Sequence, residues 1–236
     1  STTLEFTSSN WNSAQTVTVT GVNDDLIDGN QTTTITIAVV DQVSDDDFDS
    51  LADKTVSVTT TDDDTASFTV TQSGGATAVS ESGTSDTFTV VLGAQPSSDV
   101  VISVTSGDTG EATVSPTQLT FTSANWNSAQ TVTVTGINDD LVDGTQTSTI
   151  TMSVVDGSSD DSFDSLNDQT VSVTTADTDV AGFTIIESGG STTVAESGTS
   201  DTFTVVLDAQ PSSDVVISAT SGDTDEASVS PAQLTF

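Results

Sequence analysis

The feature that most constrains this chain is a repeat of 115 residues that contains no insertion or deletion. Trp11 and Trp126 lie 115 residues apart, in "FTSSNWNSAQTVTVTG" and "FTSANWNSAQTVTVTG". Between residues 4–31 and 119–146, only five positions differ. Such fidelity indicates a tandem array of one folding unit. The 236 residues span two repeat lengths and six further residues.

Within each repeat, apolar and polar residues alternate with a period of two. Val132 and Val134 alternate with threonines in "QTVTVTG", and Ile150 and Met152 share one face of "TSTITMSVVD". Alternation of β-branched residues predicts half-buried strands, and no stretch has helical spacing. About seven strands are expected per repeat, at 67–71, 87–92, 99–106, 112–115 with 119–122, 130–136, 147–155 and 169–175. This pattern predicts an all-β chain of tandem antiparallel Greek-key β-sandwiches, immunoglobulin-like in architecture.

Domain boundaries are expected at two Asp-rich hinges, in "TTTDDDTASFTV" and "TTADTDVAGFTI". They divide the chain into the last part of one domain (1–64), a complete domain (65–179) and the first part of a third (180–236). Half a sandwich leaves strand edges and one core face open. We therefore expect the partners to be neighbouring repeats of the same, longer chain or identical chains arranged head-to-tail. The longer chain is the favoured alternative.

The charge of the chain excludes several classes of function. It has 36 acidic residues and one basic residue, Lys54, for a formal net charge of −35. Nucleic acid and anionic membrane surfaces are therefore not expected as partners, and no apolar run is long enough to insert into a bilayer. Histidine, cysteine and tyrosine are absent, so imidazole and thiol chemistry is excluded. A carboxylate-based enzyme such as a glycosidase is also disfavoured, because catalytic pockets rarely recur in near-identical tandem copies.

Most acidic residues of the complete domain fall in loops that a Greek-key sandwich could bring to one pole. Several ionised carboxylates in close proximity repel each other unless a cation lies among them. Oxygen donors alone favour a hard cation, and Ca²⁺ with its flexible coordination fits better than Mg²⁺. The alternative is that acidic loops are simply solvated, and for residues 41–53 and 156–168 both readings stay open. Phe48 and Phe163 in these two segments are expected to tether the loop to the core.

Two stretches carry a resemblance to a known family. "VSVTTTDDDTASFTV…AVSESGTSDTFTVVL" resembles the junction between consecutive Calx-beta domains, where an Asp triplet precedes a strand and a V-S-E turn. "LTFTSANWNSAQTVTVTGINDD" resembles the strand of that family that leads into a D-D pair. The resemblance implies a seven-stranded sandwich that binds calcium at one end, beside the linker. Tandem copies of this kind are similar to the extender region of large RTX-type bacterial surface adhesins.

Carried over by motif, the resemblance implies a set of calcium ligands at matched positions. The V-S-E glutamate corresponds to Glu81 and Glu196, and a further loop aspartate to Asp108 and Asp223. The D-D pairs and the linker clusters supply the remaining expected ligands: Asp24, Asp25, Asp139, Asp140, Asp62, Asp63, Asp64, Asp177 and Asp179. Thr178 interrupts the second linker cluster, so a fuller set of ions is expected at the first junction.

Two functions fit these observations. The favoured one is a calcium-binding structural extender of a repetitive secreted cell-surface protein that takes part in adhesion or biofilm formation. The alternative is a segment or subunit of an extracellular filament or surface layer. Both place the chain outside the cell or on a bacterial surface. A ligand-binding adhesin tip is not expected, because near-identical repeats suit spacing better than recognition of a target. Calcium would tie loops and linker to one centre and offset the repulsion within a −35 chain.

Overall fold

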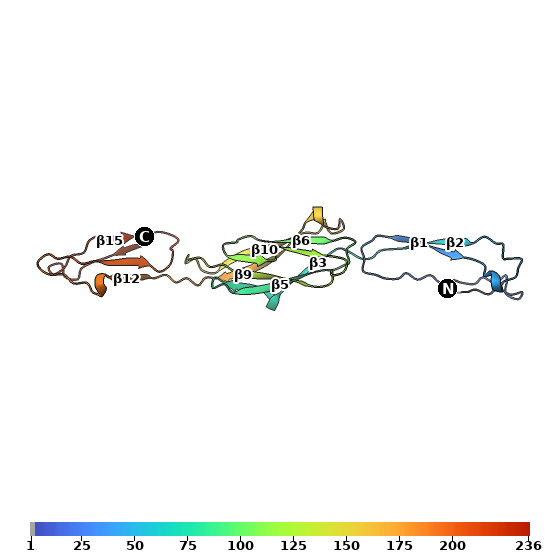
Figure 1. Ribbon diagram of the computed structural model, residues 1–236, viewed down its shortest axis with the longest axis horizontal. Helices are drawn as coiled ribbons and strands as arrows, with labels where there is room; N and C mark the ends of the chain where they lie inside the picture. The colour runs from blue at the N-terminus through green and yellow to red at the C-terminus, as the bar shows by residue number, and fades with distance from the viewer. Residues whose placement is uncertain (1–2) are drawn as a thin grey trace. The chain divides into compact units, whose positions relative to one another are not determined.

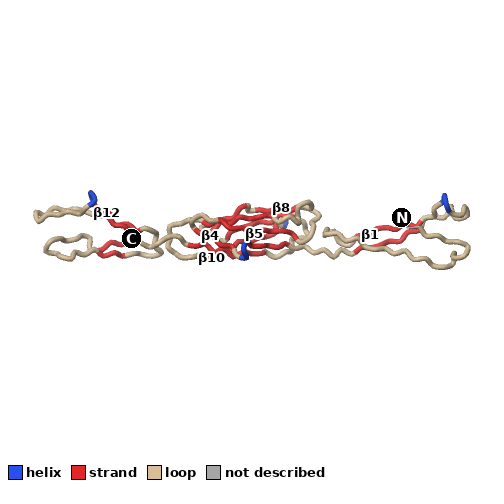
Figure 2. Tube along the Cα trace, turned by 90° about the horizontal axis from the view of Figure 1, so that it is seen from below, coloured by secondary structure: helices blue, strands red, loops and turns tan. Residues whose placement is uncertain are grey.

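The computed structural model of the protein describes residues 3–236, and its regular secondary structure is almost entirely β-strand. The chain divides between Thr65 and Ala66 into two compact units. Only the second unit contains a closed sandwich within the described residues, at positions 66–179 (Figures 1 and 2). The three-domain division at the two Asp-rich hinges stays a prediction.

The sandwich consists of two sheets that enclose one core. The four-stranded sheet has the order β3 (Phe68–Gln72), β5 (Ser85–Leu92), β9 (Gln130–Gly136), β7 (Ala112–Ser115). The five-stranded sheet has the order β4 (Thr77–Ser80), β11 (Gln169–Ala176), β10 (Gln146–Val154), β6 (Val100–Ser106), β8 (Gln118–Phe121). An all-β sandwich is thus the observed fold, as the sequence predicts.

The core sits where the alternation of side chains places it. Val132 and Val134 of β9 and Ile150 and Met152 of β10 are fully buried, while the threonines between them lie on the outer faces. Every second side chain of a strand lies on the same face, so the apolar residues of these two strands predict which face is buried. Phe163 is also fully buried and fixes its loop against the core, as expected.

The structure differs from the expectation in the number and direction of strands. The sandwich has nine strands rather than about seven. β4 was not expected, and the stretch at 112–122 divides into β7 and β8, which belong to different sheets. β4 also runs parallel to β11, with Ser80 opposite Ala176, so the sandwich is not purely antiparallel. A four-residue strand between glycine-containing turns carries too little alternation to be recognised from sequence.

Residues 3–65 contain one antiparallel strand pair. β1 (Gln31–Ile37) pairs with β2 (Lys54–Thr60), which begins at the only basic residue of the chain. Several large apolar side chains of this segment are exposed, including Trp11 and Val56. The expectation that Phe48 tethers its loop is wrong here, because this side chain is 56% exposed and has no second sheet to pack against.

Residues 180–236 contain two separate antiparallel pairs. β12 (Phe183–Glu187) pairs with β13 (Phe203–Leu207), and β14 (Val216–Ser218) pairs with β15 (Gln233–Thr235). Four short 3-10 turns complete the elements: η1 (Asp41–Val43), η2 (Ser73–Gly75), η3 (Asp156–Ser158) and η4 (Ser188–Gly190). Among the described residues, no helix has the length and apolar character that a membrane span requires.

Candidate metal centre

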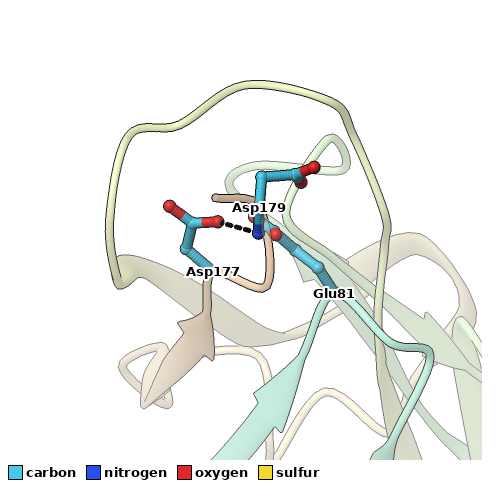
Figure 3. A group of neighbouring side chains, drawn as sticks. All are labelled: Glu81, Asp177 and Asp179. Carbon is cyan, nitrogen blue, oxygen red and sulfur yellow. Dashed lines mark hydrogen bonds between the residues drawn. The ribbon is translucent and has the colours of Figure 1, made fainter. Parts of the chain in front are cut away.

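Three carboxylates converge at the end of the sandwich where β4 and β11 finish. Glu81 follows β4 directly, and Asp177 and Asp179 follow β11, with one oxygen from each of the three lying within 4.8 Å of the others (Figure 3). The parallel pairing explains this convergence, because two parallel strands end at the same edge of a sheet. The Glu81 N–H donates to the carbonyl oxygen of Ala176 at 3.1 Å, and this hydrogen bond joins the end of β4 to the end of β11.

Backbone N–H groups hold two of the three carboxylates in place. Thr178 N donates to Glu81 Oε2 at 2.8 Å, and Asp179 N donates to Asp177 Oδ1 at 2.6 Å. Gly144 N, in the loop between β9 and β10, donates to Asp177 Oδ2 at 2.7 Å. The hydrogen bonds from Asp179 and Gly144 lower the pKa of Asp177, so this carboxylate is firmly ionised. The linker and the β9–β10 loop are therefore connected through Asp177.

Two further oxygens of the group are buried and have no hydrogen-bond partner. Glu81 is 1% exposed, yet its Oε1 accepts no hydrogen bond, and the same holds for the buried Oδ2 of Asp179. The hydrogen bond from Thr178 lowers the pKa of Glu81, but burial and the charges of neighbouring aspartates raise it above its usual value overall. Burial, followed by the charge of Asp177, raises the pKa of Asp179. Buried acceptors without a partner are unfavourable, and here two of them belong to one group of carboxylates.

Glu111 is a further carboxylate at this site and was not among the expected ligands. It precedes β7, and its carbonyl oxygen accepts a hydrogen bond from Ile137 N at 2.9 Å, which places it beside the D-D loop. Its Oε2 is buried without a partner. Burial raises the pKa of Glu111, and the charges of Asp143, Asp139, Asp108 and Glu81 raise it further. The sequence signal for Glu111 is its position directly before the buried Ala112, whose partner in β9 is Gly136, where the D-D loop begins.

The other expected ligands of the complete repeat surround the three carboxylates. Asp139 is half-buried, and its charge raises the pKa of both Glu81 and Asp179. Asp140 and Asp108 are both exposed. The charge of Asp140 raises the pKa of Asp179, and the charge of Asp108 raises the pKa of Glu111. Asp139 Oδ1 accepts a hydrogen bond from Leu141 N, and Asp108 Oδ1 accepts one from Gly110 N. The structure thus brings all six expected ligands of this repeat to one end of the sandwich.

In residues 3–65, the expected ligands also cluster, around Asp64. Burial, followed by the charges of Asp62, Asp63, Asp25 and Asp24, raises the pKa of Asp64. The Asp62 carboxylate accepts hydrogen bonds from the N–H groups of Asp28, Gly29 and Asp64 at 2.7 to 3.1 Å. This repeats the bonds that Asp177 accepts from Gly144 and Asp179. The fuller metal occupancy expected at this junction stays a prediction.

The two expected ligands in the last segment lie apart from such a group. Glu196 and Asp223 are both exposed. Asp223 Oδ1 accepts a hydrogen bond from Asp225 N at 3.0 Å, as Asp108 does from Gly110. The β-strands equivalent to β9, β10 and β11, which would bring further loops beside Glu196, are not part of residues 180–236.

In a second acidic segment, 156–168, Asp160 accepts hydrogen bonds from neighbouring protein groups. Asp160 Oδ2 accepts hydrogen bonds from Ser97 N and Oγ at 2.7 Å and from Ser98 N at 2.9 Å, and its Oδ1 accepts one from Ser162 N. Burial acts to raise the pKa of Asp160, but these hydrogen bonds prevail and lower it to about 2. Asp160 therefore links two loops without needing a cation.

Comparisons with known proteins identify partial structural likenesses. No family model matches the sequence, and no curated protein is similar to it. The MSP-domain-like protein SSP-19 of Caenorhabditis elegans is 16% identical, with 46% of this chain and 98% of that chain covered and a TM-score of 0.31. Domains 4 and 5 of the S-layer protein SbsC are 22% identical over 53% of this chain and 52% of that chain, with a TM-score of 0.30.

A third solved structure belongs to a bacterial chaperone. The E. coli chaperone DraB is 10% identical, with 64% of this chain and 88% of that chain covered and a TM-score of 0.33. Bacterial surface-layer domains are thus among the structural neighbours of this all-β chain. At these TM-scores the likenesses carry no argument about its function, which has to be argued from the residues of the site.

Proposed function

We propose that this chain is a calcium-stabilised structural module of a repetitive extracellular or cell-surface protein. The observation that carries the proposal is a set of three buried carboxylate oxygens without hydrogen-bond partners: Glu81 Oε1, Glu111 Oε2 and Asp179 Oδ2. Glu81 and Asp179 belong to the group of carboxylates whose oxygens lie within 4.8 Å of one another. Glu111 is close enough that the charge of Glu81 raises its pKa. A chain with one basic residue has no side chain to neutralise them, and a cation from solution would do so.

The donor set fits calcium. Every side-chain ligand is a carboxylate oxygen, and Ca²⁺ takes about six to eight oxygen ligands in flexible geometry. Glu81, Asp177 and Asp179 would hold the ion, with Glu111 and Asp139 as the nearest further donors. The cation would supply the missing partner for Glu81 Oε1 and Asp179 Oδ2, which no N–H group reaches.

The mechanical consequence follows from which elements carry these ligands. Glu81 belongs to the end of β4, Asp177 and Asp179 to the linker that leads toward residue 180, and Asp139 to the β9–β10 loop. Without a cation, mutual repulsion favours separation of linker and loop. With a cation, all three elements share one centre, and the exit of the linker from the sandwich is stiffened. Such stiffening suits the extender region of a surface adhesin, the role that the Calx-beta resemblance implies.

Thermal unfolding of the full chain in millimolar calcium and in EDTA tests the proposal. We expect a higher midpoint with calcium, because binding to the native state alone adds about 2.7 kcal/mol at 100 times the dissociation constant. Asp177→Asn should reduce the calcium-dependent increase. Asp168→Asn is the matched control, because it removes the same charge at the other end of β11 and should retain the increase. Identical midpoints for the wild type in calcium and EDTA would refute the proposal.

Assembly into an extracellular filament or surface layer is the second candidate. The specific observation in its favour is the near-identical 115-residue repeat, because identical modules in series build a regular structure. This candidate does not require calcium and can be tested separately.

A further inference from the structure

The loop between β9 and β10 makes a backbone contact that the candidate metal centre does not use. The carbonyl oxygen of Asp140 accepts a hydrogen bond from Gln210 N at 2.6 Å, and Val142 N donates to the carbonyl oxygen of Gln210 at 3.2 Å. Leu141 and Gln210 thereby form a parallel β-bridge outside the named strands. Gln210 lies between β13 and β14, beyond the linker. The loop therefore pairs with the segment that follows the sandwich.

Two hydrogen bonds to carboxylates hold the loop side of this contact in place. Asp139 Oδ1 accepts a hydrogen bond from Leu141 N at 2.8 Å, and Asp177 Oδ2 accepts one from Gly144 N at 2.7 Å. Leu141 is half-buried, although it lies in a loop. The backbone between these two hydrogen bonds is thus held in one conformation and can present its N–H and C=O groups to another segment.

The sequence prepares Gln210 for the same contact. Pro211 follows it directly, and the residue before a proline is restricted to extended backbone conformations. An extended residue presents its N–H and C=O groups as a strand does. Both hydrogen bonds of the bridge involve only backbone atoms of Gln210, and the residue itself is exposed. The contact therefore depends on the backbone at this position and not on the glutamine side chain.

The residue types that form the contact belong to the repeat. Residues 24–26 repeat the Asp-Asp-Leu sequence of residues 139–141 at the offset of 115. Residues 94–98 repeat the sequence "AQPSS" of residues 209–213 without a change. The contact therefore uses no residue that is particular to one copy of the repeat.

We propose that residues 140–142 are a docking segment for the turn at Gln210, and that this backbone clasp holds the segment after the linker to the sandwich without any cation. The linker is one connection between these two parts of the chain, and the clasp is a second connection at a separate place. Two connections restrict rotation about the linker, which the linker alone would permit. The proposal goes beyond the calcium-stabilised module, because the clasp consists of protein N–H and C=O groups alone.

Hydrogen exchange of the full chain, followed by NMR in EDTA, tests the clasp. The amide protons of Val142 and Gln210 should be protected at least about tenfold, because a hydrogen-bonded amide exchanges only when its contact opens. Ser213 is the internal reference, since it is exposed and its N–H has no partner in the part of the chain that the structure describes. Protection of the first two amides is measured against this third one.

Two substitutions at position 210 separate the backbone from the side chain. Gln210→Pro removes the N–H group that reaches Asp140, so the amide of Val142 should lose its protection. Gln210→Ala retains both backbone groups and should protect Val142 as the wild type does. The amides of β9 and β10 should stay protected in both variants, which verifies that the sandwich is folded.

A disulfide measures the same contact independently of exchange. Opposite residues of a β-bridge lie within the Cα separation of about 4.4–6.8 Å that a disulfide requires. Leu141→Cys/Gln210→Cys should therefore oxidise within single chains, both in calcium and in EDTA, and the chain has no native cysteine that could interfere. Leu141→Cys/Ser213→Cys is the control. Its disulfide should form at least about tenfold more slowly, because Ser213 lies outside the bridge.

Two results obtained in EDTA would each overturn the proposal. They are amides of Val142 and Gln210 that exchange as fast as that of Ser213, and a Leu141→Cys/Gln210→Cys disulfide that forms no faster than the control. Protection that appears only with calcium would also overturn it, because the contact would then be a consequence of cation binding and the proposed function would stand. Unfolding midpoints that do not respond to calcium, together with protected amides in EDTA, would instead refute the proposed function and support the clasp.

Discussion

At the scale of single residues, Glu81 has an unfavourable environment. Its carboxylate is almost fully buried, one oxygen is satisfied by Thr178 N, and the other faces the charges of Asp177 and Asp179 without a partner. A residue in this situation weakens the fold until something neutralises it. On the calcium proposal, the same residue supplies a ligand when a cation is bound.

Glu81→Gln should therefore change stability in opposite directions under two conditions. In EDTA, the variant should unfold at a higher temperature than the wild type, because it removes a buried charge and retains an acceptor for Thr178 N. In millimolar calcium, it should unfold at a lower temperature, because a ligand is lost. Differential scanning calorimetry of both proteins measures the crossing. A variant that is less stable by the same amount in both conditions would contradict this explanation.

Asp160 is the opposite case, a carboxylate whose partners are all protein groups. Its pKa is lowered to about 2, below the value of about 3.9 for an aspartate in an unfolded chain. The stability it contributes is therefore present above pH 4 and is lost as the pH falls toward 2. Asp160→Asn should destabilise the protein by about 1–3 kcal/mol at pH 6 and by less at pH 2.5.

Urea unfolding in EDTA at the two pH values checks this difference. Asp161→Asn is the matched control, because the neighbouring side chain is exposed and should show little change at either pH. A deficit for Asp160→Asn that is as large at pH 2.5 as at pH 6 would show that packing, rather than the ionised carboxylate, links the two loops.

At the scale of elements, the parallel pairing of β4 with β11 is the feature that builds the site. It places Glu81 and Asp177 at one edge, although they are far apart in sequence. Gly136, the last residue of β9, lets this arrangement form. A Cβ atom on Gly136 would collide with the backbone carbonyl of Ser80, the residue before Glu81. The close approach of β9 and the end of β4 thus depends on the absence of a side chain.

Gly136→Ala should destabilise the sandwich by about 1–3 kcal/mol and weaken calcium-dependent stabilisation, because the end of β4 must move. Gly21 is the counterpart in the first segment, and a Cβ there would meet only Thr60 Cγ2, at an ordinary 3.7 Å. Gly21→Ala should therefore change stability by less than about 0.5 kcal/mol when measured on dilute, unassembled protein. Equal effects of the two substitutions would show that the Ser80 contact is unimportant.

At the scale of the whole molecule, the sequence predicted the fold class and the buried faces but not the pairing that forms the site. Alternation in β9 and β10 was sufficient to orient Val132 and Ile150, because every second residue shares a face. β4 was not predicted because its four residues show too little alternation of apolar and polar side chains. The proximity of Glu81 to Asp177 was implied only by family resemblance, since parallel pairing is a long-range property.

The role of Glu111 could not be predicted because its position depends on the same long-range geometry. Its sequence context, "SGDTGEATVS", shows two acidic residues in one turn without indicating which of them is buried. Asp108 was the expected ligand, and the structure leaves it exposed while Glu111 has a buried, unpartnered oxygen. Burial of a loop side chain depends on the neighbouring elements, here β9 and the loop that follows it.

The single basic residue at the start of β2 has a consequence for proteolysis. Enzymes that cleave after lysine or arginine can attack only the bond between Lys54 and Thr55, so the sandwich at 66–179 offers them no target. Gln169, the counterpart of Lys54 in β11, is half-buried, and its side-chain amide donates a hydrogen bond to the carbonyl of Phe68. Lys54 itself is exposed, so the bond after it is the one place in residues 1–236 that is open to a trypsin-like protease.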